Sequence, residues 1–203
     1  MNDHTATDFL PQRGNFRDLI AFRKAECIYD ITVLFTRKYL SKGDRTIDQM
    51  VQAARSGKQN IAEGCAASTT SRETEIKLLN VAKASFQELL LDYEDYLRVN
   101  GLSQWSVGNP RLEKLRTICT ANNESVYYRE IFDKCNAEMV CNLAITLIHQ
   151  NDIFLRKLIE RAKSDFLENG GIREQMTRGR IAYRNGHREA VTYTHQTLPT
   201  ILR

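Results

Sequence analysis

Proline is nearly absent from this chain, and its absence constrains the fold more than any other feature of the sequence. The three prolines are Pro11, Pro110 and Pro199, so residues 12–109 and 111–198 contain none. Proline breaks helices because it lacks a backbone N–H and its ring clashes with the preceding turn. Two such long stretches without it indicate an all-α protein. A length of 203 residues favours a single domain.

Apolar residues recur at spacings of three and four, which is the period of a helix buried along one face. The first such run follows Asn15, a plausible N-cap, and lasts to about residue 40. A second run is predicted to end at Gly64, because a residue without Cβ can take the left-handed position after a helix. Thr70 and Glu73 have the spacing of a capping box, which predicts a third helix over about 71–98.

A fourth long helix is predicted from about Asn136 to Leu167. Short connections between the first three helices make neighbours antiparallel, and helices of this length can pack as a bundle. Between the third and fourth, the segment 100–136 begins as a glycine-rich linker and continues as two short helices broken near Asn122. We therefore predict an antiparallel up-and-down four-helix bundle over 15–168, with a helical insert at 100–136 between helices three and four.

The excess positive charge lies at the C-terminal end of the chain. The formal net charge is +4, yet residues 1–168 contain 23 basic and 23 acidic side chains. We predict that 169–203 is a basic suffix, partly disordered, because its charges and glycines leave few grouped apolar residues. A helix that crosses this segment and docks on the same or a neighbouring subunit is the alternative. Residues 1–14 are expected to be a flexible N-terminus.

Arginines of this suffix are the candidate nucleic-acid-binding residues. Guanidinium groups neutralise phosphates, and Tyr183, which lies among them, could stack on a base. The alternative is a solvated terminal segment, because charged tails are common and Glu174 and Glu189 interrupt this one. The candidates are Arg173, Arg178, Arg180, Arg184 and Arg188.

Neither catalysis nor metal binding has a recognisable signal. His149 and Asp152 are too few ligands for a metal site. The five cysteines are an odd number without the spacing of a zinc knuckle or a redox pair, so we expect buried free thiols. The sequence has neither a nucleophile elbow nor a glycine-rich phosphate loop. We expect no enzymatic activity, no metal and no cofactor.

The chain is expected to be cytoplasmic and without a membrane partner. No window approaches the roughly 18 consecutive apolar residues that a spanning helix needs. The first residues, "MNDHTATDFLPQRG", lack the basic-then-apolar order of a signal peptide.

The polar cluster Asn60, Glu63 and Gly64 is the other candidate site. Asn60 and Glu63 are three residues apart on one helix face. We interpret the cluster as structural, with Asn60 donating to backbone or Glu63 pairing with a neighbouring helix or subunit. For the nearby Lys58 we expect a subunit contact or an intrahelical pair, since its long stem can pack while the ammonium reaches out.

The run "QAARSGKQNIAEGCAASTTSRETEIKLLNVAKASFQELL", residues 52–90, resembles the signature of a bacterial four-helix-bundle family. These proteins are encoded in intervening sequences of large-subunit ribosomal RNA genes. The resemblance rests on "NIAEG" between two helices, on the serine and glutamate that open the next helix, and on Ser85 before "EL". It extends to the accessory variability protein of diversity-generating retroelements, which is similar in fold. The ending "FLENGGIREQM" resembles a suffix found in one branch of the family.

This resemblance implies a homo-oligomer. Family members form rings, which are pentamers in the known cases, and the accessory protein partners a reverse transcriptase and nucleic acid through a basic surface. The insert and the neutral body of the present chain depart from that pattern. The function we expect is that of a non-enzymatic, ring-like accessory factor associated with RNA or DNA. The alternative is a protein-interaction scaffold that binds no nucleic acid and presents its insert or its tail to another protein.

Overall fold

The computed structural model describes the backbone of residues 15–196 and the side chains of residues 15–185. Across the described residues every regular element is a helix and there is no strand, which confirms the all-α prediction. The expectation for residues 1–14 lies outside this range. In chain order the elements are the 3-10 helix η1 (Phe16–Asp18), α1 (Ile20–Tyr39), α2 (Arg45–Ala67), α3 (Arg72–Val99), α4 (Pro110–Ala121), α5 (Ser125–Phe132), α6 (Ala137–Asn169) and α7 (Ile172–Gln196).

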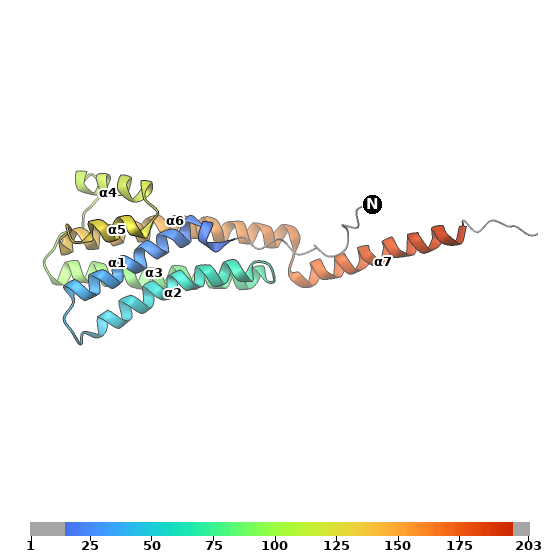
Figure 1. Ribbon diagram of the computed structural model, residues 1–203, viewed down its shortest axis with the longest axis horizontal. Coiled ribbons are helices and arrows are strands. Elements are labelled where there is room, and N and C mark those ends of the chain that lie inside the picture. The colour runs from blue at the N-terminus through green and yellow to red at the C-terminus, as the bar shows by residue number, and fades with distance from the viewer. Residues whose placement is uncertain (1–14, 197–203) are drawn as a thin grey trace, which may run out of the picture.

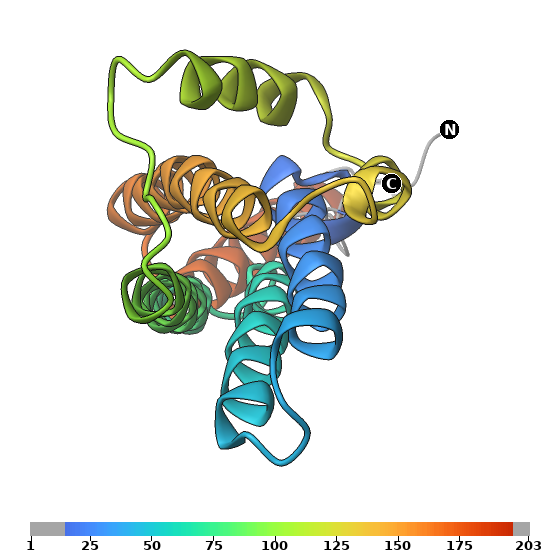
Figure 2. The ribbon, with the colours of Figure 1, turned by 90° about the vertical axis from the view of Figure 1, so that its left-hand side faces the viewer.

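One hydrophobic core contains residues of the long helices α1, α2, α3 and α6, together with Cys119 of α4 and Tyr128 and Phe132 of α5. Figure 2 shows how these helices are arranged. α1 contacts α2 and α6, and α3 contacts α2 and α6. Neighbours run in opposite directions, because only residues 40–44 and 68–71 connect the first three helices (Figure 1). Fully buried core side chains come from all four helices and include Ile28, Phe35, Ala54, Ile61, Leu89, Tyr93, Leu147 and Leu155.

Close packing of α2 on α3 depends on a glycine. Gly57 is buried in α2, and a Cβ placed on it would lie 2.5 Å from Cζ of Phe86 in α3. The ring of Phe86 is itself only 3% exposed. Glycine therefore allows an aromatic ring to lie directly against the backbone of the neighbouring helix.

The second helix does not end at Gly64, as we had predicted, but continues for almost another turn to Ala67. Gly64 is buried and its φ is not positive, so it is an ordinary helical residue. Its nearest neighbours beyond its own helix are the Glu75 carbonyl oxygen and two leucine side chains of α3. The glycine that the pattern assigned to a helix end serves instead at a helix–helix contact.

The N-cap of α3 is Ser71, one residue after the predicted Thr70. The Oγ of Ser71 accepts a hydrogen bond from the Thr74 N–H at 3.2 Å, whereas the Thr70 hydroxyl donates to the Ala67 carbonyl. Glu73 pairs with Lys77 rather than completing a capping box. The sequence offers hydroxyls at 69, 70 and 71, and the cap is the one whose backbone is extended, with φ −156° and ψ 103°.

The first helix also begins later than predicted. Asn15 accepts a hydrogen bond from the Arg17 N–H at 3.1 Å and so caps η1. Leu19 is then extended, and α1 begins at Ile20.

Between α3 and α6 the chain forms two short helices over residues 110–132, and the break between them includes Asn122 and Asn123. α4 packs on α6, and α5 packs on α1. The linker before α4 is attached to α6 through Trp105. Its backbone N–H donates to Asn142 Oδ1 at 2.7 Å, and its Nε1–H donates to Glu138 Oε1 at 2.9 Å.

Part of the suffix forms a helix, which was our alternative to partial disorder. α7 spans Ile172–Gln196, and residues 197–203 lie outside the described range. Residues 172–196 contain no proline, and the helix propensity of the other residues outweighs the propensity cost of Gly179 and Gly186. Gly170, with φ +71°, turns the chain between α6 and α7. α7 extends away from the other helices instead of docking on them (Figure 1).

Candidate functional site

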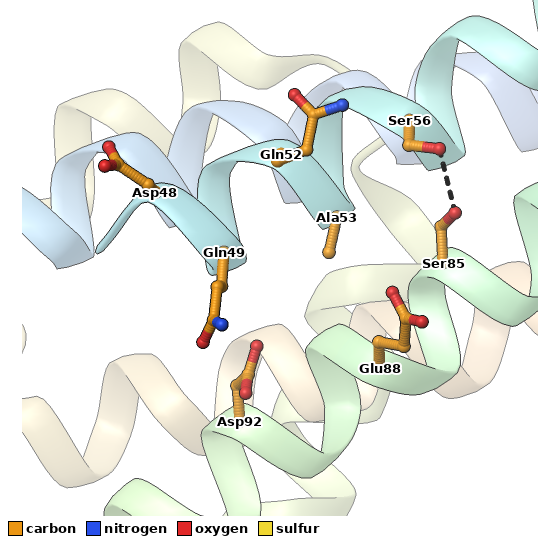
Figure 3. A pocket seen from close by; sticks show the side chains of 8 residues that line it. All are labelled: Asp48, Gln49, Gln52, Ala53, Ser56, Ser85, Glu88 and Asp92. Carbon is orange, nitrogen blue, oxygen red and sulfur yellow. Dashed lines mark hydrogen bonds between the residues drawn. The ribbon is translucent and has the colours of Figure 1, made fainter. Parts of the chain in front are cut away.

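The polar cluster around Asn60 connects two helices. The Asn60 side-chain amide donates to the Ser56 carbonyl at 2.9 Å and contacts Ser56 Oγ at 3.2 Å. Ser56 Oγ in turn shares a hydrogen bond with Ser85 Oγ of α3 at 2.9 Å, the dashed line in Figure 3. Glu63 is exposed on α2. This arrangement holds α2 to α3 and provides no activated nucleophile.

Lys58 contacts another helix of the same chain rather than forming the intrahelical pair that we considered. Its ammonium lies 4.3 Å from the centroid of the Tyr29 ring, which belongs to α1. A cation above an aromatic face is attracted by the negative potential of the ring. Lys58 thus joins α2 to α1 within one chain.

An acidic groove lies between α2 and α3 (Figure 3). It has a volume of about 630 Å³ and contains Asp48, Glu88 and Asp92 but no basic residue among its lining side chains. Burial, followed by the charges of Asp95 and Glu88, raises the pKa of Asp92 above its ordinary value. A groove of this charge repels phosphate, so it directs any nucleic-acid contact to another surface. The remaining lining residues are Gln49, Gln52, Ala53, Ser56 and Ser85.

The arginines singled out in the sequence all lie on α7. Positions 173, 180, 184 and 188 are separated by seven, four and four residues, which places them along one side of the helix. From first to last they span about 22 Å at 1.5 Å per residue. Arg173, Arg178, Arg180 and Arg184 are exposed, and Arg178 lies away from the row. α7 therefore carries a basic row on a helix clear of the other helices (Figure 1).

Three of the five thiols are buried and poorly suited to nucleophilic chemistry, whereas Cys65 and Cys135 are only partly buried, contrary to our expectation of buried thiols. Cys27, Cys119 and Cys141 are buried, and burial raises their pKa values to about 12, 11 and 12. A thiol must lose its proton to attack, so these groups are inert near neutral pH. In the described part of the chain, no three His, Cys, Asp or Glu side chains are grouped so that they could hold a metal ion.

A buried lysine is the residue that our sequence reasoning missed. Lys24 of α1 is 1% exposed and donates from Nζ to the Cys119 carbonyl oxygen at 2.6 Å. Burial lowers its pKa, and the nearby Cys119 and Cys27 oppose this shift only in part. Its position could have indicated burial, because Lys24 lies four residues before Ile28 and seven before Ile31, on the apolar face of the helix.

Comparisons of this chain with protein-family models, with curated proteins and with solved structures each found no match. None of the helices in the described range is long and apolar enough to cross a bilayer. The functional interpretation therefore depends on the residues themselves, and two regions differ from an ordinary packed helix surface. One is the basic row of α7, and the other is the surroundings of Lys24.

Proposed function

We propose that this chain is a non-enzymatic, homo-oligomeric helical-bundle protein that associates with nucleic acid through α7. The observation that carries the proposal is the row at positions 173, 180, 184 and 188 on a helix that extends away from the rest of the chain. Arginines spaced along a helix can neutralise successive phosphates, and each neutralised phosphate releases condensed counterions. Between residues 172 and 196 there are five arginines and two glutamates, with no lysine or aspartate.

The charge distribution of the other helices supports this assignment. Before residue 169 basic and acidic side chains are equal in number, and the α2–α3 face contains the acidic groove. A polyanion would be repelled from that groove and attracted to α7. The two regions are separate, so the carboxylates of the groove do not adjoin the basic row, and the five arginines of α7 outnumber its two glutamates.

For the architecture, we propose that α1, α2, α3 and α6 form an antiparallel up-and-down four-helix bundle, with residues 100–136 as an insert. The shared core and the alternating directions support this. We further propose that copies associate as a ring, in which five copies is the form that the family resemblance implies. Large apolar side chains left exposed on α3, Val81 at 47% and Leu91 at 55%, support self-association. Several copies of α7 in one assembly would multiply weak phosphate contacts.

The test compares two variants of equal net charge. One lacks the basic row of α7, and the control lacks four arginines elsewhere. The test variant changes the four row positions: Arg173→Gln, Arg180→Gln, Arg184→Gln and Arg188→Gln. The control changes four exposed arginines elsewhere: Arg37→Gln, Arg45→Gln, Arg55→Gln and Arg161→Gln. Fluorescence anisotropy with a labelled single-stranded RNA and a labelled DNA duplex measures affinity. We expect the test variant to lose about tenfold or more in affinity and the control to change little. Equal losses in both variants would contradict an interface on α7.

A protein-interaction scaffold is the second candidate, and the acidic groove favours it. A groove lined by Asp48, Glu88 and Asp92 suits a basic segment of another protein. If this is the function, a pull-down with the full chain recovers one stoichiometric protein that survives nuclease treatment. The variant Asp48→Asn, Glu88→Gln, Asp92→Asn should lose that protein. Recovery of nucleic acid alone would count against the scaffold.

A further inference from the structure

A cavity of about 910 Å³ lies between α4, α6 and the beginning of α1, distinct from both α7 and the acidic groove. α6 forms one wall and α4, which lies across from it in Figure 2, forms another. Residues 104–107 of the linker, residues 20 and 24 of α1, and Asn123 after α4 complete the lining. Its size falls within the range of about 300 to 1,000 Å³ that is typical of small-molecule sites.

Hydrogen bonds fix the walls of this cavity. Trp105 is held to Asn142 and Glu138 of α6, as described above, and the Asn142 amide also donates to the Ser103 carbonyl at 2.9 Å. On the other side, Gln150 of α6 donates from Nε2 to the Arg116 carbonyl and to Thr120 Oγ1 of α4, each at 3.1 Å. The cavity is therefore preformed between two elements that are tied together at several points.

Charge in the cavity has one sign. Lys24, Arg116 and Lys157 line it, and among its described lining residues none is acidic. Arg116 pairs at 3.0 Å with Glu113, which does not line the cavity. A buried cation is costly unless it is paired or hydrogen-bonded, and the ammonium of Lys24 is hydrogen-bonded to a neutral group, the Cys119 carbonyl.

The hydrogen bond from Lys24 to the Cys119 carbonyl stabilises the C-terminal end of α4, but this structural role does not account for the whole cavity. Cys119 is in the last turn of α4, where carbonyl groups lack intrahelical partners and a cation is favourable. That role uses one N–H of the ammonium and leaves two. It explains neither the cavity beside the lysine nor the other cations that line it.

The cavity also contains polar oxygens without partners and exposed apolar side chains. Asn123 Oδ1 and Gln150 Oε1 are buried without a hydrogen-bond partner, and both residues line the cavity. The Gln150 amide orientation is set, because its Nε2 faces the Arg116 carbonyl, which can only accept. Ile20 and Ile153 line the cavity and are 42% and 50% exposed. Unpaired buried acceptors and exposed aliphatic surface are both features of a ligand site.

We propose that this cavity binds a small organic anion with an apolar body. The anionic group lies by the Lys24 ammonium, the apolar body contacts Ile20, Ile153 and Trp105, and donors on the ligand reach the two unpaired oxygens. This goes beyond the association of α7 with nucleic acid and does not depend on it.

The first test uses two dyes that share an aromatic body. 8-Anilinonaphthalene-1-sulfonate carries a sulfonate, and N-phenyl-1-naphthylamine is the same body without it. Titrating each into the full chain and following dye fluorescence gives an affinity and a stoichiometry. We expect the sulfonate dye to bind at one site per chain, about tenfold tighter than the neutral dye, since a hydrogen bond to a charged group contributes that much. Equal affinities for the two dyes would overturn the proposal.

Variants then locate the site. Lys24→Met keeps an apolar stem but removes the charge, and its control is Lys58→Met at the half-buried lysine outside the cavity. Ile153→Glu adds a negative charge at the cavity, and its control is Val126→Glu, at a residue of α5 that is also about half exposed. We expect both cavity variants to weaken the sulfonate dye about tenfold and both controls to leave it unchanged. If Lys24→Met does not fold, as judged by circular dichroism, the Ile153 and Val126 pair decides, and equal affinities in that pair would reject the cavity.

Competition identifies the anionic group. Sodium decanoate and phenyl phosphate are each added to the complex with the sulfonate dye, and 1-decanol is the uncharged control. We expect at least one of the two anions to displace the dye and decanol to fail. Displacement by decanol as effective as by decanoate would show that the cavity selects apolar bodies alone, and would overturn the role of Lys24.

Discussion

At the residue scale, two buried glycines of α2 meet α3 in different ways. Gly57 lies under the ring of Phe86, so closely that a Cβ would overlap it at 2.5 Å. At Gly64 the nearest atoms would be 3.5 Å from a Cβ, an ordinary van der Waals distance. Because both are helical and buried, they form a matched pair in which only the available space differs.

We expect Gly57→Ala to destabilise the fold and Gly64→Ala to stabilise it. Overpacking a core costs about 1–3 kcal/mol, whereas alanine gains about 1 kcal/mol over glycine in a helix. The net effect is a loss of up to about 2 kcal/mol at Gly57 and a gain of up to about 1 kcal/mol at Gly64. Urea unfolding followed by circular dichroism measures both. Equal midpoints for the two variants would contradict the packing of Phe86 on Gly57.

The N-cap of α3 gives a second prediction at this scale. Ser71→Ala should cost about 1 kcal/mol, because the Thr74 N–H loses its acceptor. Thr70→Ala is the control and should leave the free energy of unfolding almost unchanged, since its hydroxyl is exposed and donates to a carbonyl. Urea unfolding distinguishes them, and a larger loss at Thr70 would restore the capping box that the sequence suggested.

At the element scale, the linker between α3 and α4 is held to α6 by a titratable group. Glu138 accepts from Trp105 Nε1–H and from the Ser103 N–H, and these hydrogen bonds lower its pKa below the ordinary 4.5. A carboxylate with a lowered folded pKa contributes its full stabilisation above pH 4.5, and this is lost as pH falls through the lowered value.

Trp105 is the single tryptophan of the chain, so its fluorescence reports this contact. We expect an acid titration to change the emission with a midpoint below pH 4.5, while far-ultraviolet circular dichroism stays constant. Glu138→Gln should abolish the transition. Glu94→Gln is the control and should preserve the transition. Glu94 lies in α3 and accepts a hydrogen bond from Gln104 of the same linker. A transition that survives in Glu138→Gln would assign it to another group.

The long helices could be predicted from spacing because one face of each is buried along most of its length. α3 and α6 begin and end within about two residues of the prediction, which is the usual uncertainty of helix ends. α7 was only an alternative in the sequence because it buries little apolar surface, so the pattern that identifies a packed helix is weak there. The end of α2 was missed because glycine serves both helix ends and close helix contacts, and only the neighbouring helix decides between them.

At the scale of the whole molecule, the cavity beside Lys24 could not be read from the sequence. Its lining brings together residues of α1, α4 and α6, and Lys24 and Gln150 are more than a hundred residues apart. A lysine within an apolar stripe signals only that a stem is packed. What surrounds its ammonium depends on where α4 lies, and no local pattern determines that.

Self-association is the prediction that belongs to this scale. Light scattering during size-exclusion chromatography should give a mass that is a multiple of 23.4 kDa. Leu91→Glu, which places a charge on the exposed apolar surface of α3, should lower that mass. Val99→Glu, at an exposed position near the end of the same helix, is the control and should not. A monomer at micromolar concentration would reject the ring.

The salt dependence of nucleic-acid binding tests the central claim most directly. The affinity of the full chain for a DNA duplex is measured from low to moderate sodium chloride, beside the variant with glutamine at the four row positions of α7. Each phosphate contact contributes about 0.9 to the slope of log affinity against log salt, so the variant should be shallower by about 3 to 4. Parallel slopes, or no salt-dependent binding by the unaltered chain, would contradict a phosphate-binding role for α7.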